Sequence, residues 1–159
     1  MKYAKKTNSR IIAMMVLYNC DINKFKEDNF EEEVINTINF ILSNNVLEKN
    51  DDNSSDYVIE YDDIFLKSLV KGILEKRDYI DYIISLCTER YTLDALSYVD
   101  RNILRCGTYE IIYMHTPKQI VINELVNVAR AYSEIEGFKA SKFDNAILDK
   151  IANANFKEE

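Results

Sequence analysis

The sequence predicts an all-α protein. Only three of its 159 residues are Gly and one is Pro, so few positions interrupt a helix. Apolar residues recur at helical spacing through most of the chain, and no segment shows the alternation of a half-buried strand. Apolar residues make up 47% of the composition, which is enough for a sizeable core. These observations predict about seven helices and no sheet in a single domain, residues 1–159.

The first half of the chain contains four helical segments and one long loop. Residues 10–18 form an apolar helix segment after the polar TNS, and residues 30–42 have an apolar stripe at helical spacing. Residues 43–63 are polar and acidic, and they predict a long, mobile loop. Helical periodicity resumes over 64–74, with Leu69 on the core face, and continues over 77–87.

The second half predicts three more helices. The first covers 99–111 and is reached through a short connector. Thr116, Pro117 and Gln119 read as a capping box that opens the next helix. Ser141 and Asp144 suggest a second capping box at the start of the last helix. The expected core positions of the helix after Pro117 are Ile120, Leu125, Val128, Ala129 and Tyr132.

The segment YVDRNILRCGTYEIIYM, residues 98–114, raises a question. Ile103 belongs to its apolar face, and Glu110 lies seven residues later, which places a carboxylate on the same face. Arg101 and Arg105 share a neighbouring face. The simplest interpretation is that Glu110 is a buried acid paired with a cap or an arginine, because an unpaired buried charge is costly.

Charge is distributed unevenly. The formal net charge is −7, but residues 1–20 carry four basic residues and no acid. Residues 21–63 carry thirteen acids against three lysines, a balance of −10. This pattern is compatible with a local anion site at the N-terminal end. Charge alone favours a simpler interpretation, in which the lysines only make the start of the helix soluble.

No pattern predicts catalysis, a metal or a cofactor. His115 is the only histidine and stands in a predicted turn, which is more typical of a structural or solvated residue than of a catalyst. Cys20, Cys87 and Cys106 are widely spaced in apolar surroundings, which predicts buried, reduced thiols in a cytoplasmic protein. No apolar run is long enough for a membrane span, and no signal peptide is evident.

Four segments together resemble the NusB family of bacterial antitermination and ribosomal-RNA transcription factors. The segment VDRNILRCGTYEI (99–111) is similar to that family's hallmark helix, and VINELVNVARAY (121–132) to its INE-containing helix. The segment KFDNAILDKIA (142–152) resembles its last helix, and RIIAMMVLY (10–18) its first. The order and spacing of the four segments make the resemblance specific.

The resemblance implies two small helical bundles packed side by side, without enzymatic activity. We place their boundary near residue 88, giving subdomains 1–88 and 89–159. Family members bind the boxA segment of ribosomal-RNA leaders as single-stranded RNA. They do so with NusE, a small-subunit ribosomal protein, within the RNA polymerase antitermination complex, and so promote rRNA transcription and ribosome biogenesis.

The resemblance also implies a site. We expect RNA to follow a groove formed by the first helix, the 99–111 helix and the start of the last helix. Tyr18 could stack on a base or belong to the core. For Arg105, direct RNA contact and structural ion pairing both remain open. The expected RNA-binding residues are Lys2, Lys5, Lys6, Arg10, Tyr18, Arg105 and Lys142, and Glu31, Glu32 and Glu33 are expected to attract a basic protein partner.

The chain departs from the family in three places. Lysines replace most of a dense arginine cluster in the first helix, which predicts weaker RNA binding because lysine cannot bind phosphate bidentately. Arg10 remains, and we expect it to be exposed. Asp144 and Ala146 stand where an apolar residue and a glycine are common, and the 43–63 loop has no clear counterpart.

Two alternatives stay open, and the thinned arginine cluster supports the first of them. The chain could be a protein-interaction bundle in which RNA binding is weakened. It could also be a stand-alone RNA-binding domain related to the front end of rRNA cytosine methyltransferases. The chain shows no methyl-donor-binding domain before it ends at Glu159, which disfavours a methyltransferase.

Overall fold

The computed structural model describes residues 2–24, 29–44, 59–89, 91–134 and 139–158. Within these ranges the chain forms seven α-helices, one short 3-10 helix and no strand, which confirms the all-α prediction. No helix described is long and apolar enough to cross a membrane. The elements are α1 (Lys2–Asn23), α2 (Phe30–Asn44), α3 (Asp63–Glu75), α4 (Arg77–Cys87), η2 (Leu93–Ala95), α5 (Tyr98–Ile112), α6 (Lys118–Tyr132) and α7 (Ala140–Asn153).

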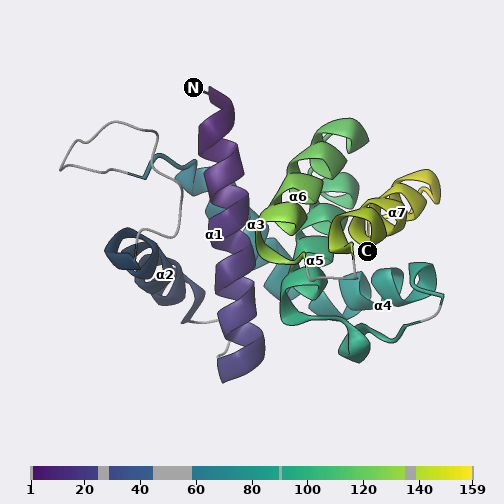
Figure 1. Ribbon diagram of the computed structural model, residues 1–159, viewed down its shortest axis with the longest axis horizontal. Helices are drawn as coiled ribbons and strands as arrows, with labels where there is room; N and C mark the ends of the chain where they lie inside the picture. The colour runs from purple at the N-terminus through teal and green to yellow at the C-terminus, as the bar shows by residue number, and fades with distance from the viewer. Residues whose placement is uncertain (1, 25–28, 45–58, 90, 135–138, 159) are drawn as a thin grey trace.

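Helix α1 runs through the middle of the molecule, with α2 on one side and α5, α6 and α7 on the other (Figure 1). It packs mainly against α3, α5 and α2. Helices α5, α6 and α7 pack against one another, and α4 packs against α5 and α7. Helix α5 therefore contacts both halves of the chain. The subdomain boundary near residue 88 stays a prediction.

Helix α1 begins earlier than its apolar segment suggested. The polar residues before Arg10 continue the helix back to Lys2, since alanine and lysine are good helix formers. The hydroxyl of Ser9 is satisfied within the fold: it donates to Lys5 O at 2.8 Å and accepts from Asp62 N at 2.8 Å. Ser9 thus joins α1 to the start of α3 instead of ending a helix.

The long acidic segment is only partly described. Residues 45–58 lie outside the described residues. The predicted mobility of the loop therefore stays a prediction. Its last residues are ordered parts of the fold, because Ile59 is buried and Asp62 caps α3 by accepting from Phe65 N at 3.0 Å.

Both predicted capping boxes are wrong. Helix α6 begins at Lys118 after Pro117, and the cap has no side-chain hydrogen bond. Helix α7 begins at Ala140, two residues earlier than the box requires, and the N–H of Ser141 donates to Glu134 Oε1 at 3.1 Å. A side-chain cap does form at α5, where Ser97 Oγ accepts from Asp100 N at 3.0 Å. At α7, a hydrogen bond from Ser141 N to Glu134 is present in place of the local capping bond that the sequence suggested.

The core follows the predicted stripes closely. Leu69 and Ile103 are both fully buried, and so is Leu125. Ile120 is an exception, since 49% of it is exposed one turn into α6. Cys20, Cys87 and Cys106 are buried, as expected, and no disulfide joins them within the described residues. The buried stripes of α3 and α5 hold the central helices together and so fix the position of α1.

Candidate nucleic-acid interface

The first turns of α1 present two exposed lysines, Lys5 and Lys6. The ammonium of Lys6 lies 5.2 Å from the ring centroid of Phe65 on α3, close enough for a cation–π contact. The side chain of Lys2 lies outside the described residues. Exposed ammonium groups on one helix end, with one of them oriented by an aromatic ring, can bind phosphate oxygens.

Arg10 lies in the core, and the expectation that it is exposed is wrong. Only 3% of it is accessible. Its Nε donates to Glu110 Oε2 and its Nη2 to Glu110 Oε1, each at 2.8 Å. Burial alone would lower the pKa of Arg10, but the hydrogen bonds and charge of Glu110 outweigh it and the pKa is raised. Arg10 is therefore a permanent cation that joins α1 to α5.

This pair answers the question raised by Glu110. Glu110 is fully buried, and its two oxygens accept the two parallel N–H groups of Arg10. Glu124 on α6 lies 3.7 Å from Arg10 Nη1 and accepts from Thr7 Oγ1 at 2.7 Å. The carboxylates of α5 and α6 therefore hold the basic end of α1 in place.

Arg105 is also held by acids. Its Nε and Nη2 donate to Asp81 on α4 at 2.7 and 2.8 Å, and its Nη1 lies 2.9 Å from both oxygens of Asp21 on α1. Only 4% of Arg105 is accessible. Of the two interpretations left open, the structure favours structural ion pairing.

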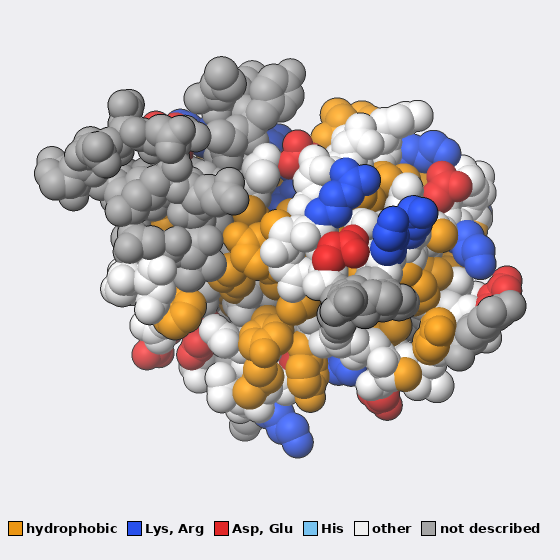
Figure 2. Space-filling model, viewed as in Figure 1, with side chains coloured by type: hydrophobic (Ala, Val, Ile, Leu, Met, Phe, Trp, Pro, Cys, Tyr) orange, Lys and Arg blue, Asp and Glu red, His pale blue; other side chains and the backbone are white. Residues whose placement is uncertain are grey.

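Tyr18 lines an apolar groove. Its ring packs edge-on against Tyr98 on α5, with centroids 6.0 Å apart. The groove encloses about 380 Å³ between α1, α2 and the ends of α5 and α6. Hydrophobic side chains gather around α1 along the middle of this face (Figure 2). The groove is lined by Met14, Met15, Tyr18, Asn19, Asn36, Thr37, Phe40, Val99 and Tyr132.

One polar atom in this groove has no hydrogen-bond partner among the described residues. Thr37 is 3% exposed, and its Oγ1 meets neither donor nor acceptor there. Phe40, one turn along α2, is 58% exposed. The exposed ring of Phe40 and the unsatisfied hydroxyl of Thr37 are features that a binding partner would cover.

The remaining site residues lie on other elements. Glu31, Glu32 and Glu33 form the first turn of α2, with the first two exposed. Lys142 is exposed in the first turns of α7, which packs on α6, α5 and α4. The structure thus gathers Lys6 and Arg10 of α1 around Phe65 of α3 and places Lys142 on α7.

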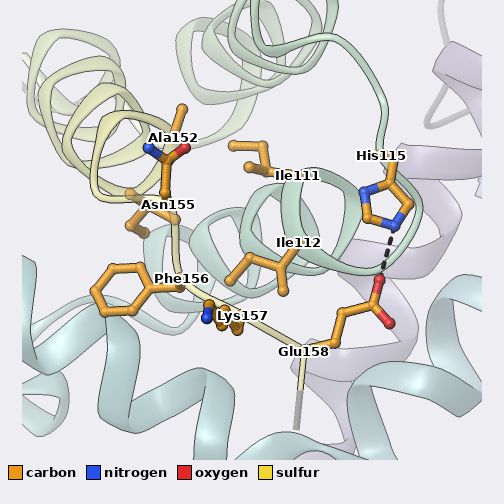
Figure 3. A pocket seen from close by; sticks show the side chains of 9 residues that line it. Ile111, Ile112, His115, Ala152, Asn155, Phe156, Lys157 and Glu158 are labelled. Carbon is orange, nitrogen blue, oxygen red and sulfur yellow. Dashed lines mark ion pairs between the residues drawn. The ribbon is translucent and has the colours of Figure 1, made fainter.

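A second cavity, of about 500 Å³, lies between the end of α5 and the C-terminal residues that follow α7 (Figure 3). Isoleucines of α5 and Phe156 face it, and His115 Nε2 lies 2.7 Å from Glu158 Oε1 at its edge. Lys157 O accepts from Tyr79 on α4 at 2.9 Å. His115 has a φ of 53°, so it serves as the left-handed residue that ends the turn after α5. The structure thus gives His115 a structural position in this turn.

Sequence patterns did not identify Phe65 and Glu124 as parts of this region. Phe65 lies in the predicted 64–74 helix, whose apolar spacing indicated only packing, yet its ring centroid lies 5.2 Å from the Lys6 ammonium and 5.3 Å from the Arg10 guanidinium carbon. Glu124 stands in the INE segment, yet its contact with Thr7 spans 117 residues along the chain, which no local pattern can reveal.

Together these features define an all-α binding protein with exposed lysines at one helix end, an apolar groove and buried ion pairs that fix the helices. The sequence model of the NusB family matches residues 7–153. The chain therefore belongs to the NusB family.

Relatives and solved structures agree with this assignment. The transcription antitermination protein NusB of Fervidobacterium nodosum is 33% identical over 151 residues, which cover 94% of each chain. The corresponding protein of Thermodesulfovibrio yellowstonii is 33% identical over 153 residues, covering 93% of this chain and 91% of that protein. The structure of T. maritima NusB superposes with a TM-score of 0.69 at 26% identity, covering 92% of this chain and 89% of that one. A complex of the antitermination factors NusB and NusE with double-stranded RNA gives a TM-score of 0.68 at 26% identity, covering 93% and 96%.

Proposed function

We propose that the protein is a non-catalytic transcription antitermination factor of the cytoplasm. In this role it binds boxA-like single-stranded RNA of ribosomal-RNA leaders together with a NusE-type ribosomal protein. It thereby joins the RNA polymerase antitermination complex and promotes rRNA transcription and ribosome biogenesis. The observation that carries the proposal is the family match over residues 7–153. The exposed lysines of α1, Lys5 and Lys6, lie directly before this range.

The proposed RNA contacts are electrostatic. Lys2, Lys5 and Lys6 bind phosphates from the start of α1, and Lys142 extends the basic surface on α7. Arg10 and Arg105 support this surface indirectly, since each is paired with acids in the core. Tyr18 offers a ring edge at the groove, where a base or a partner side chain can pack.

The proposed protein partner is basic. Glu31, Glu32 and Glu33 lie at the start of α2, the helix that also contributes Phe40 and Thr37 to the apolar groove. Complementary charge mainly raises association rates. Replacing the three glutamates with glutamine is therefore expected to slow association with a NusE-type protein more than it speeds dissociation, as measured by surface plasmon resonance. Unchanged kinetics would mean that these acids only favour the start of the helix.

A titration of labelled RNA tests the proposal. Fluorescence anisotropy is measured with a boxA-like strand, a scrambled strand of equal length and a duplex, each with and without the NusE-type protein. The proposal expects the boxA-like strand to bind most tightly, and more tightly when the partner is present. Equal binding of all three RNAs, unaffected by the partner, would contradict it.

One alternative also has structural support. Arg10 and Arg105 are committed to ion pairs, which leaves lysines to bind RNA and suits a bundle specialised for protein contacts. The same titration separates the two functions: tight partner binding without measurable RNA binding would favour the protein-interaction bundle.

A further inference from the structure

A buried pair of carboxyl groups joins the C-terminal helices. Asp100 lies in the first turn of α5 and is 4% exposed, and Asp144 lies on α7 and is fully buried. After burial itself, Asp100 is the group that acts most strongly on the Asp144 carboxyl and raises its pKa. Asp144 occupies a position where the family resemblance leads one to expect an apolar residue, so the pair is a feature of this chain's own sequence.

The partners of the two acids differ. Asp100 Oδ2 accepts from Ser97 Oγ at 2.8 Å, and Asp100 Oδ1 accepts from Ser133 Oγ at 2.5 Å. Neither oxygen of Asp144 meets an N–H or hydroxyl donor within the described part of the chain. An ionised carboxylate can only accept hydrogen bonds, so two ionised acids could not bond to each other. A fully buried Asp144 that receives no donor is the environment in which a carboxyl keeps its proton.

The surroundings disfavour two negative charges. The chief charged groups facing Asp144 are Asp100 from α5 and Glu134 from just beyond the end of α6, and both are acidic. No group of three or more metal-binding side chains occurs among the described residues, so the structure offers no metal site to neutralise the pair. A proton is the cation that fits.

We propose that Asp144 is a neutral carboxylic acid that shares its proton with Asp100, and that this proton ties α7 to α5 and to the end of α6. Asp144 donates to the Asp100 carboxylate, and Asp100 in turn accepts from Ser133. The pair also supports the apolar groove, because Val99 and Tyr132, which line it, are the chain neighbours of Asp100 and Ser133.

The shared proton makes stability depend on pH. Burial, followed by the hydrogen bond and charge of Asp100, raises the pKa of Asp144 to about 10. In the unfolded chain the same carboxyl has a pKa of about 3.9. Between these values the folded protein holds a proton that the unfolded chain releases. The stabilising contribution is thus complete below the unfolded pKa and is lost as pH rises toward the folded one, with the unfolding constant growing about tenfold per pH unit.

The variant Asp144→Asn tests this directly. Its carboxamide has nearly the same shape and can donate to Asp100, but it cannot lose a proton. Urea unfolding is measured for the parent and the variant at several pH values from about 5 to about 9. The ratio of the parent's unfolding constant to the variant's is expected to rise by about tenfold per pH unit. Asp149→Asn is the matched control, because Asp149 lies on the exposed side of α7 and its ratio should stay constant.

A second measurement does not depend on the variant's stability. The infrared spectrum of the folded parent near neutral pH should contain the carbonyl band of a protonated carboxylic acid, and D144N should lack it. A parent spectrum without that band would overturn the proposal, as would a D144N ratio that is independent of pH. A melting temperature that rises with Mg²⁺ or Ca²⁺ in the parent but not in D144N would also overturn it, by replacing the proton with a metal ion.

Discussion

At the scale of single residues, buried arginines dominate the region around α1. Arg10 pairs with Glu110 through two 2.8 Å hydrogen bonds, with both side chains at most 4% exposed. Such a pair is not evidence of net stabilisation, because removing two charges from water offsets much of their attraction. Its clearer effect is geometric, since two parallel bonds fix one orientation of α1 on α5.

Arg10→Ala is therefore expected to damage the fold, contrary to the small loss that an exposed arginine would give. The substitution leaves Glu110 buried without its partner, which typically costs about 3–5 kcal/mol. Urea unfolding of the parent and variant measures the loss. Arg130→Ala is the control: Arg130 is exposed on α6, and its loss should change stability by less than about 0.5 kcal/mol.

The double variant Arg10→Met, Glu110→Leu refines this test. Replacing both charges with apolar side chains removes the unpaired acid, so it should be much less destabilising than Arg10→Ala. A double variant as unstable as the single one would show that packing, and not the uncompensated charge, causes the loss.

At the scale of elements, helix α5 lies close to its neighbours because Gly107 has no side chain. A Cβ at Gly107 would lie 2.4 Å from Leu148 Cδ2 on α7 and 3.0 Å from Leu125 Cδ1 on α6. Both leucines are fully buried and have little room to move. The crossing of three helices thus depends on this glycine.

Gly107→Ala is expected to lower stability although alanine is the better helix former. Overpacking a core costs about 1–3 kcal/mol, against a gain of about 1 kcal/mol from helix propensity. Ala146→Gly on the exposed side of α7 is the contrasting control and should lose about 1 kcal/mol from propensity alone. A Gly107→Ala variant that melts above the parent would mean that the leucines rearrange without cost.

Local patterns predicted the helices well and their ends poorly. The apolar stripes located Leu69 and Ile103 because burial repeats with the period of the helix. The ends depend on tertiary contacts, such as the bond from Ser141 N to Glu134 at α7, which a four-residue motif does not encode. The start of α1 was missed because its lysines lack an apolar stripe.

For the candidate site, too, local patterns located a segment of the chain but not the contacts between distant segments. The resemblance pointed to the basic end of α1, where Lys5 and Lys6 are exposed, but it could not show that Arg10 turns inward to an acid 100 residues away. The sequence placed Glu110 on the apolar face and suggested an arginine partner. Only the packing of α1 against α5 identifies that partner.

At the scale of the whole molecule, one continuous core joins the helices. Leu69 of α3 and Ile103 of α5 are both fully buried within it. Leu69→Ala and Ile103→Ala should each cost about 2–5 kcal/mol, because each leaves a cavity and loses apolar burial. Thermal melts of both variants test this. A variant that melts with the parent would show that the site can collapse around the smaller side chain.

The described basic residues of the candidate site form two groups, buried arginines that are paired with acids and lysines that are exposed. Arg10 and Arg105 hold the helices together, and we propose that the exposed lysines bind RNA. If Lys2, Lys5, Lys6 and Lys142 neutralise about four phosphates of a single strand, the log–log salt slope of RNA affinity should be about −3. The variant Lys5→Ala, Lys6→Ala removes about two of these contacts and should reduce the slope to about −1.4.

That slope, measured by anisotropy with a boxA-like strand at increasing salt, tests the central claim most directly. The control is Lys118→Ala, Lys150→Ala, which changes net charge equally at two lysines paired with Asp149 and Glu89. The account predicts a shallower slope and weaker binding for the α1 variant, with parental values for the control and parental melts for both. A flat salt response of the parent, or equal slopes for the two variants, would contradict it.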